Sequence, residues 1–102
     1  MAKESTPSSN SFRIAETETF RKFLKKNPGL QRIYNRIQSF IYPQLRQNPF
    51  FGPNIKRLKG QFSEVFRFRI GSFRLFYTID QQDLIVFILS LRDRKDAYGK
   101  KR

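Results

Sequence analysis

The sequence predicts an α+β fold in which two N-terminal helices pack on one face of a small, mainly antiparallel, twisted sheet of about four strands. Apolar residues recur every three or four positions between residues 30 and 41, which is the period of an amphipathic helix. Three runs between residues 65 and 92 are rich in β-branched and aromatic residues and are separated by short turn sequences. The helical patterns precede these runs instead of alternating with them, which favours the α+β class.

The first part of the chain is divided between a tail, a short strand and a first helix. Residues 1–11, MAKESTPSSNS, are small and polar, so we expect a disordered tail before a single domain at residues 12–102. Residues 12–15 can form a short strand. Thr17 or Thr19 can cap the first helix, and the sequence NPG at 27–29 ends it. The apolar positions of this helix are Phe20, Phe23 and Leu24.

The second helix has one continuous apolar stripe, formed by Leu30, Ile33, Tyr34, Ile37, Phe40 and Ile41. Pro43 is expected to end or kink this helix near Tyr42, because proline lacks the N–H that the helix uses for its hydrogen bonds. The apolar pattern nevertheless extends to Leu45, so we expect an irregularity near the proline. Residues 48–53, NPFFGP, then form a turn-rich connector.

The three strand-like runs, residues 65–70, 73–79 and 84–92, predict an antiparallel meander, because the short gaps between them suit hairpins. Side chains alternate between the two faces of a strand. We expect one face to pack on the helices with Phe66, Phe68, Ile70, Phe73, Leu75, Tyr77, Ile79, Ile85, Phe87, Leu89 and Leu91. We expect the other face to display Arg67, Arg69, Arg74, Phe76, Thr78, Ser90 and Arg92. Four arginines therefore converge on one face, and the three runs add no carboxylate to it.

The chain is strongly basic, with 21 Lys and Arg residues against 8 Asp and Glu, a formal net charge of +13. Such a charge favours RNA, DNA or an acidic protein as a partner. The absence of cysteine and histidine excludes disulfides, thiolate metal sites and histidine-based catalysis, and we expect no metal or cofactor. The longest apolar run is too short to cross a membrane and residues 1–11 lack the pattern of a signal peptide, so we expect a cytoplasmic protein without a membrane partner.

Arginine suits a phosphate site because its planar guanidinium donates two parallel hydrogen bonds and stays charged at physiological pH. In metal-independent RNA cleavage the 2′-hydroxyl attacks the neighbouring phosphorus, and donors aimed at the phosphate oxygens stabilise the charge that develops there. The basic face is therefore compatible with a nuclease site. The alternative is a sheet face that the arginines simply keep solvated. Phe76, on the same face, can either pack or stack on a base.

Four elements occur in a fixed order along the chain: Asn48-Pro49, Leu58-Lys59-Gly60, the run FRLFY at 73–77, and the closing segment RDRKDAY at 92–98. In these elements, and over nearly everything from Phe12 to Tyr98, the chain resembles the RelE-type toxins of prokaryotic toxin–antitoxin systems, the messenger-RNA interferases of the RelE/ParE superfamily. The resemblance implies a RelE-like fold. It also implies a ribosome-associated endoribonuclease that cleaves messenger RNA in the A site by metal-independent attack of the 2′-hydroxyl and so inhibits translation.

The resemblance further implies roles for individual residues. Arg74 and Arg92 would bind the scissile phosphate and stabilise its charge, and Tyr98 would stack on a base or orient the 2′-hydroxyl. Arg67 and Arg69 stand where ribosome-dependent members commonly have lysines, and they would contact phosphate or help to activate the nucleophile. Further RNA contacts are expected from Lys56, Lys59, Arg94 and Lys95. The residues considered as general base are Lys56, Lys59, Glu64 and Lys95.

The implied partners are an acidic antitoxin covering the basic face, the ribosome with its messenger RNA, and promoter DNA reached through the antitoxin. Two other functions stay open. One is a ParE-like gyrase inhibitor, since that branch shares the fold, although the basic cluster argues against it. The other is a catalytically inactive binder of RNA or ribosomes, favoured by arginine in place of both strand lysines and by Asp93 in a motif where several relatives carry histidine. For Tyr98 the alternative is a packing role at the surface.

Overall fold

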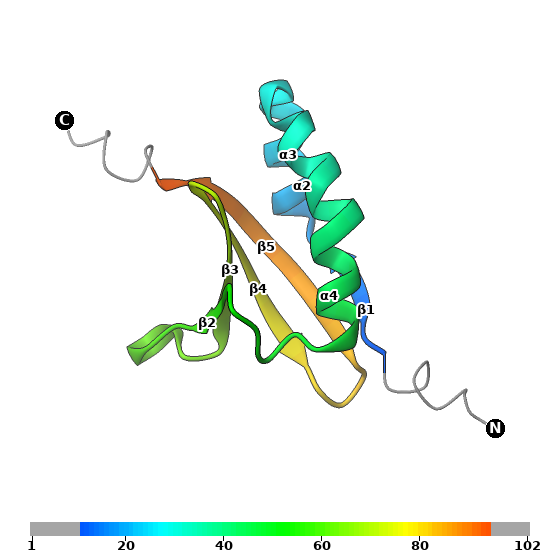
Figure 1. Cartoon of the computed structure of the whole chain (residues 1–102), viewed down its shortest axis with the longest axis vertical. Coiled ribbons are helices and arrows are strands. Elements are labelled where there is room, and N and C mark those ends of the chain that lie inside the picture. Colours follow the sequence, from blue (N-terminus) through cyan, green and yellow to red (C-terminus); the bar gives the residue numbers. More distant parts are fainter. Residues whose placement is uncertain (1–10, 95–102) are drawn as a thin grey trace.

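The computed structural model of the chain describes residues 11–94, which form a five-stranded sheet with helices along one face (Figure 1). The strands are β1 (Arg13–Glu16), β2 (Ile55–Arg57), β3 (Val65–Ile70), β4 (Phe73–Asp80) and β5 (Ile85–Asp93), in the spatial order β1-β5-β4-β3-β2. β1 runs parallel to β5, and all other neighbouring strands are antiparallel. The α+β class and the meander of β3, β4 and β5 are confirmed.

The sheet has five strands where about four were predicted. The additional strand is β2, which contains only three residues, IKR, and is too short to show an alternating pattern. The predicted first strand exists, shifted by one residue to Arg13–Glu16, and it makes the sheet mixed because it lies parallel to β5. The first ten residues, which belong to the expected tail, lie outside the described residues.

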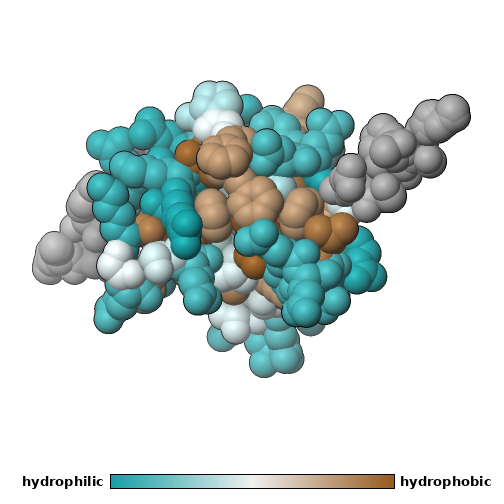
Figure 2. All heavy atoms as spheres, turned by 90° about the horizontal axis from the view of Figure 1, so that it is seen from below, coloured by the Kyte–Doolittle hydropathy of each residue, from teal (hydrophilic) through white to brown (hydrophobic). Residues whose placement is uncertain are grey.

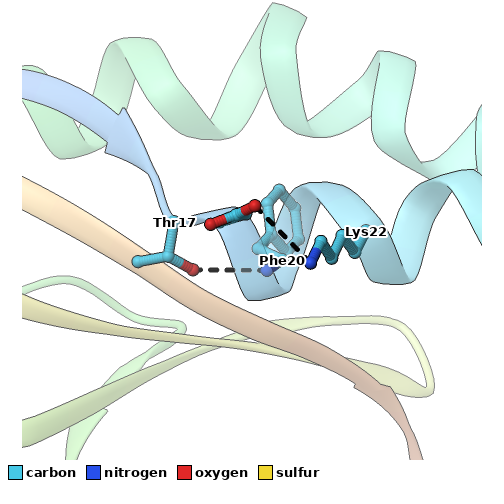
Figure 3. A network of polar contacts seen from close by, with 4 residues as sticks. Thr17, Phe20 and Lys22 are labelled. Carbon is cyan, nitrogen blue, oxygen red and sulfur yellow. Dashed lines mark hydrogen bonds and ion pairs between the residues drawn. The ribbon is translucent and has the colours of Figure 1, made fainter.

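α2 (Glu18–Lys26) begins directly after Thr17, one of the two predicted caps. The Thr17 hydroxyl accepts a hydrogen bond from the backbone N–H of Phe20 at 3.3 Å, a contact drawn in Figure 3. The same hydroxyl donates a hydrogen bond to the backbone carbonyl of Ile88 at 2.7 Å. Because Ile88 belongs to β5, Thr17 both starts the helix and attaches it to the sheet.

The second helical stretch contains the irregularity that Pro43 predicts. It consists of η1 (Pro28–Leu30), α3 (Gln31–Arg36), η2 (Ile37–Ile41) and α4 (Tyr42–Gln47). η2 is a π-helical turn, in which the N–H of Tyr42 donates to the carbonyl of Ile37, five residues earlier. The helix does not end near Tyr42. It continues to Gln47, because Pro43 falls in the first turn of α4, where a missing N–H is tolerated.

The core lies between the helices and the sheet. Its buried members are Phe12, Phe20, Ile37, Ile41, Tyr42, Leu45, Phe68, Ile70, Leu75, Tyr77, Val86, Ile88 and Leu91. The residues of β3 and β4 that were predicted to face the helices belong to this cluster or pack against it. Tyr77 also donates a hydrogen bond from its hydroxyl to the carbonyl of Pro49 at 2.7 Å, which fixes the connector after α4 to the sheet.

β5 contains a bulge next to the middle of β4. Phe76 pairs with Ser90, but the next residue of β4, Tyr77, pairs with Ile88. Leu89 is therefore an extra residue in β5 without a partner in β4. Because side chains alternate with a period of two, one extra residue exchanges the two faces for the part of the strand that lies beyond it.

The bulge overturns part of the predicted facing. Ile85, Phe87 and Leu89 were expected to face the helices, but Val86 and Ile88 occupy the core in their place and are completely buried. Ile85 and Phe87 lie on the opposite face of the sheet, because they pair with β4 residues that point away from the helices. The prediction assumed that side chains alternate strictly along β5, and the extra residue Leu89 interrupts this alternation.

A shared carboxylate joins β1 to the second helical stretch. Glu16 accepts a hydrogen bond on Oε2 from the hydroxyl of Tyr34 at 2.6 Å and another from the hydroxyl of Tyr42 at 2.7 Å. Gln38 in turn donates from Nε2 to the Tyr34 hydroxyl at 3.1 Å. We name Glu16, Tyr34 and Tyr42 the tyrosine clasp. It holds α3 and α4 against the edge of the sheet.

Apolar side chains also reach the surface. Phe40, Phe51 and Phe62 are exposed, and the view of Figure 2 shows apolar side chains gathered at the centre of a largely hydrophilic surface. None of the helices within residues 11–94 is both long enough and apolar enough to span a membrane.

Candidate functional site

Three arginines form one row across the centre of the sheet. Arg69 of β3 pairs with Arg74 of β4, and Arg74 pairs with Arg92 of β5. Directly paired residues of antiparallel strands point to the same face, with their Cβ atoms roughly 4.5–5.5 Å apart. We name Arg69, Arg74 and Arg92 the arginine row. Its side chains point away from the helices, because neighbouring Leu75 is completely buried on the helical side.

A second row lies beside the first on the same face. Lys56 of β2 pairs with Arg67 of β3, Arg67 pairs with Phe76 of β4, and Phe76 pairs with Ser90 of β5. We name Lys56, Arg67, Phe76 and Ser90 the mixed row. The structure thus brings Arg67, Arg69, Arg74 and Arg92 onto one face, as the alternation predicted, and adds Lys56 to them.

Burial and the neighbouring arginines both affect the pKa of Arg67. Its partial burial, followed by the positive charges of Arg74 and Arg69, lowers the pKa of its guanidinium from the ordinary value. Its Nε atom is buried and has no hydrogen-bond partner among residues 11–94. A buried donor without an acceptor is costly, and an anion bound between these arginines would both accept from Nε and offset their mutual repulsion.

These cations take part in no ion pair with another residue of the described range 11–94. The ion pair found within residues 11–94, between Lys22 and Glu18, lies on the exposed surface of α2 and involves none of them. No group of three or more acidic side chains that could hold a metal ion occurs within the same residues, and the chain has no histidine or cysteine. What the two rows offer chemically is a set of fixed, charged hydrogen-bond donors.

The other residues predicted from the sequence are distributed around this face or fall outside the structure. Arg94 directly follows β5, and its N–H donates to the carbonyl of Ser72 at 2.7 Å, near the end of the arginine row. Lys59 is exposed just before η3 (Gly60–Phe62), beyond the other end of β3. Lys95 and Tyr98 lie outside the described residues.

Glu64, considered from the sequence as a general base, lies away from the arginine row. It lines an open depression of about 730 Å³ together with Thr78, Asp80 and Phe87. Thr78 pairs with Phe87 and with Val65, one row further from the arginines than the mixed row. Glu64 therefore stands at the opposite end of the basic face, where it lines one hollow with Asp80 and Phe87 and a second with Arg57.

Phe87 is a residue of this face that the sequence did not reveal. Strict alternation assigns it to the core, and no signal in the run LIVFILSL marks the position of a bulge, since both faces of this run are apolar. The register of β4 and β5 places it beside Thr78, on the same face as Phe76 and the arginines.

The comparison with protein families matches residues 15–98 to the family described as the ParE toxin of type II toxin–antitoxin systems. A protein of Methanocaldococcus jannaschii that carries the name toxin RelE1 is 47% identical over 45 residues. That alignment spans about half of each protein, 44% of this chain and 49% of the relative.

Solved structures agree with this assignment over most of the chain. A chain of the RelBE2 toxin–antitoxin complex of Mycobacterium tuberculosis is 30% identical, with a TM-score of 0.69, and the match covers 82% of this chain and 99% of that one. The RelB–RelE antitoxin–toxin complex of Methanococcus jannaschii contains a chain that is 25% identical, with a TM-score of 0.59 and coverage of 86% and 99%. The protein therefore belongs to the RelE/ParE family of toxins of type II toxin–antitoxin systems, as a RelE-type member.

Proposed function

We propose that this toxin is a ribosome-associated endoribonuclease that cleaves messenger RNA without a metal ion and so stops translation. The observation that carries the proposal is the arginine row, in which Arg69, Arg74 and Arg92 stand side by side on one face with no acidic partner within residues 11–94. Like charges directly opposite each other destabilise a sheet, and a phosphate bound between the arginines would offset their repulsion.

The proposed reaction is an internal transfer at one phosphate. The 2′-oxygen forms a bond to the neighbouring phosphorus while the bond from phosphorus to the 5′-oxygen breaks, leaving a 2′,3′-cyclic phosphate and a 5′-hydroxyl. Negative charge builds up on the two non-bridging oxygens in between. Arg74 and Arg92 are the proposed donors to these oxygens, because they are paired across β4 and β5 and can approach one phosphate together.

Two proton transfers complete this reaction. The 2′-hydroxyl loses its proton to a base, and the departing 5′-oxygen gains one from an acid. Among the residues considered as base, Lys56 is the one that the sheet register places beside Arg67. We assign it to the 2′-hydroxyl, with Arg67 and Arg69 as phosphate contacts. Arg74 or Arg92 would supply the proton to the 5′-oxygen, and Tyr98 would orient or stack on the substrate.

The remaining proposed contacts surround these residues. Lys59, Arg94 and Lys95 would bind RNA phosphates outside the cleavage point. The partner in the cell would be an acidic antitoxin that covers the basic face, and the complex would reach promoter DNA through that antitoxin. Support comes from the net charge of +13 and from the similarity to toxin chains that were solved as RelB–RelE complexes.

A second candidate function is inhibition of DNA gyrase, because the family that matches residues 15–98 is described by its ParE toxins. The two functions act on different targets. A ribonuclease leaves messages with new 5′ ends that begin with a hydroxyl, whereas a gyrase inhibitor leaves messages intact and changes the supercoiling of DNA.

The deciding experiment incubates the purified toxin with ribosomes halted on a defined message and maps the 5′ ends of the RNA. We expect a new end in or next to the A-site codon, in the presence of a metal chelator. In parallel, gyrase supercoiling is measured with the same toxin preparation. Ribosome binding without new ends would identify an inactive binder, and loss of supercoiling with intact RNA would identify a gyrase inhibitor.

A further inference from the structure

The bulge at Leu89 places two phenyl rings on the basic face. Phe76 lies in the mixed row, and Phe87 lies in the next row, opposite Thr78. Phe76 and Phe87 are thus diagonal neighbours on adjacent strands, and such neighbours stand about 7–8 Å apart. Without the extra residue in β5, Phe87 would point into the core.

Neither ring is used for packing against another aromatic ring within residues 11–94. Phe50, Phe66 and Tyr77, on the helical side, form edge-on and stacked contacts with one another at 5.7–6.1 Å between ring centres. Phe76 and Phe87 have no such contact in the described part of the chain, and both are only half-buried. Each side chain therefore keeps part of its surface accessible to a partner.

The surroundings of the rings change from cationic to acidic along the face. Arg74 stands two residues before Phe76 on β4, about 7 Å away along the strand. Beyond Phe87, the open depression of about 730 Å³ is lined by Glu64 and Asp80. A ligand that lies across both regions needs negative charge at one end, a flat apolar middle and hydrogen-bond donors at the other end.

We propose that Phe76 and Phe87 each stack on one base of a single-stranded RNA whose phosphates lie on the arginine row. This inference deepens the proposed function and rests on it. A nucleotide has the required order of parts: a phosphate, a flat base, and base edges that carry amino groups for acceptors such as Glu64 and Asp80. The strand must be single, since the bases of a duplex already stack on each other.

Hydroxyl groups accompany both rings. Ser90 is the cross-strand partner of Phe76, and Thr78 is the cross-strand partner of Phe87. A hydroxyl can donate or accept, so each stacked base would meet a group that can bind its edge or the neighbouring 2′-hydroxyl. Stacking on the rings does not distinguish one kind of base from another, and the hydroxyls add a means of selecting between them.

The test measures binding alone, so that it does not depend on cleavage. The probe is a fluorescent single-stranded RNA of about ten nucleotides with 2′-O-methyl sugars, which cannot be cut by 2′-attack. It is compared with a probe of equal length and charge that lacks the bases of the central nucleotides. Stacking strengthens binding by about five- to a hundredfold per base, so the unmodified protein should prefer the probe with bases by at least this factor.

Phe87→Ala and Phe76→Ala should each reduce this preference about five- to a hundredfold. Phe87→Leu should reduce it as well while keeping an apolar side chain, which separates stacking from any loss of folding, and Phe87→Trp should retain it. Phe62→Ala is the matched control, since Phe62 is exposed on η3, away from both rows, and should change nothing. Arg74→Ala should weaken both probes equally.

Equal affinity of the unmodified protein for the two probes would overturn the inference. So would an unchanged preference in folded Phe76→Ala and Phe87→Leu proteins. One further outcome would mark the face as a protein-binding surface only. In that outcome an acidic peptide removes the probe equally from the unmodified protein and from Arg74→Ala, and neither protein prefers the probe with bases. Failure of the cleavage proposal looks different, because the base preference would persist while halted ribosomes yield no new RNA ends.

Discussion

Arg74 lies between two other arginines, and this position has consequences for stability as well as for function. Its neighbours in the row are Arg69 and Arg92, and its charge also lowers the pKa of Arg67. Like charges directly opposite each other destabilise a sheet by a few tenths of a kcal/mol to about 1 kcal/mol per pair. The arginines that would stabilise a phosphate therefore weaken the free protein.

Replacing Arg74 by glutamine should make the protein more stable. Removing about 0.5 kcal/mol of repulsion between the arginines corresponds to a rise in the melting temperature of roughly 2–4 °C for a domain of this size. The gain should shrink at 1 M salt, because screening already reduces the repulsion. Calorimetry at low and high salt measures both effects. Arg32→Gln, on the exposed surface of α3, is the control, and a lower melting temperature for Arg74→Gln than for this control would contradict the account.

The sequence predicted correctly which face of the sheet carries the four arginines. Arg67, Arg69 and Arg74 lie in β3 and β4, which are regular, so alternation alone assigned them to one face. Arg92 was assigned correctly because it lies on the same side of the bulge as the buried residue Leu91. The pairing of Lys56 with Arg67 required β2, which has no pattern of its own.

Thr17 connects α2 to β5 with one hydroxyl. Replacing Thr17 by valine keeps the shape of the side chain and removes both the cap to Phe20 and the hydrogen bond to Ile88. We expect a loss of about 1–2 kcal/mol in the free energy of unfolding, measured in urea. Thr19→Val is the control, because Thr19 is exposed within α2 and does not cap it. Equal losses of unfolding free energy for the two variants would show that the cap does not stabilise the protein.

The turn between β3 and β4 keeps Arg69 and Arg74 in register. It contains Gly71, which has a backbone φ of +59°, a conformation that disfavours residues with a Cβ atom. Gly71→Ala should cost roughly 1–2 kcal/mol of stability. Gly29→Ala has open space and no positive φ, so it should change the stability by less than about 0.5 kcal/mol. A denaturant titration compares the two, and a neutral Gly71→Ala would mean that the turn adapts freely.

Irregular elements limited what the sequence could predict. Pro43 predicted an irregularity in the helix. Whether the helix ends there or continues through a π turn depends on how much the burial of Ile41 and Leu45 stabilises the continued helix, and this is a tertiary effect. The bulge at Leu89 leaves no trace in a run that is apolar on both faces. The consequence for the site is that Phe87 was assigned to the core and belongs to the basic face.

The tyrosine clasp holds the helical layer to the sheet, and its phenols predict a response of the whole fold to alkaline pH. Burial, followed by the hydrogen bond to Glu16 and its negative charge, raises the pKa of Tyr34 from 10.0 to about 12, and the same causes raise the pKa of Tyr42. Because the folded state favours the neutral phenol, its contribution to stability is complete below pH 10 and is lost as the pH rises through about 12.

The stability difference between the unmodified protein and Tyr34→Phe should therefore be constant up to about pH 10 and should shrink toward pH 12. Below pH 10 the variant should be less stable by roughly 1 kcal/mol, the value of one hydrogen bond. Denaturant titrations at several pH values give this difference directly. A difference that grows above pH 10 would contradict the proposed role of the clasp.

The sheet brings basic side chains from separate strands together on the face that the helices leave uncovered, and we propose that this face cuts RNA. The most direct measurement is the rate of cleavage on halted ribosomes by Arg74→Ala and Arg92→Ala, with Arg32→Ala as the matched control. Loss of one donor to the transition state should slow cleavage by about a hundredfold to a thousandfold in each row variant and leave the control unchanged. Cleavage by both row variants at the rate of the control would contradict the account.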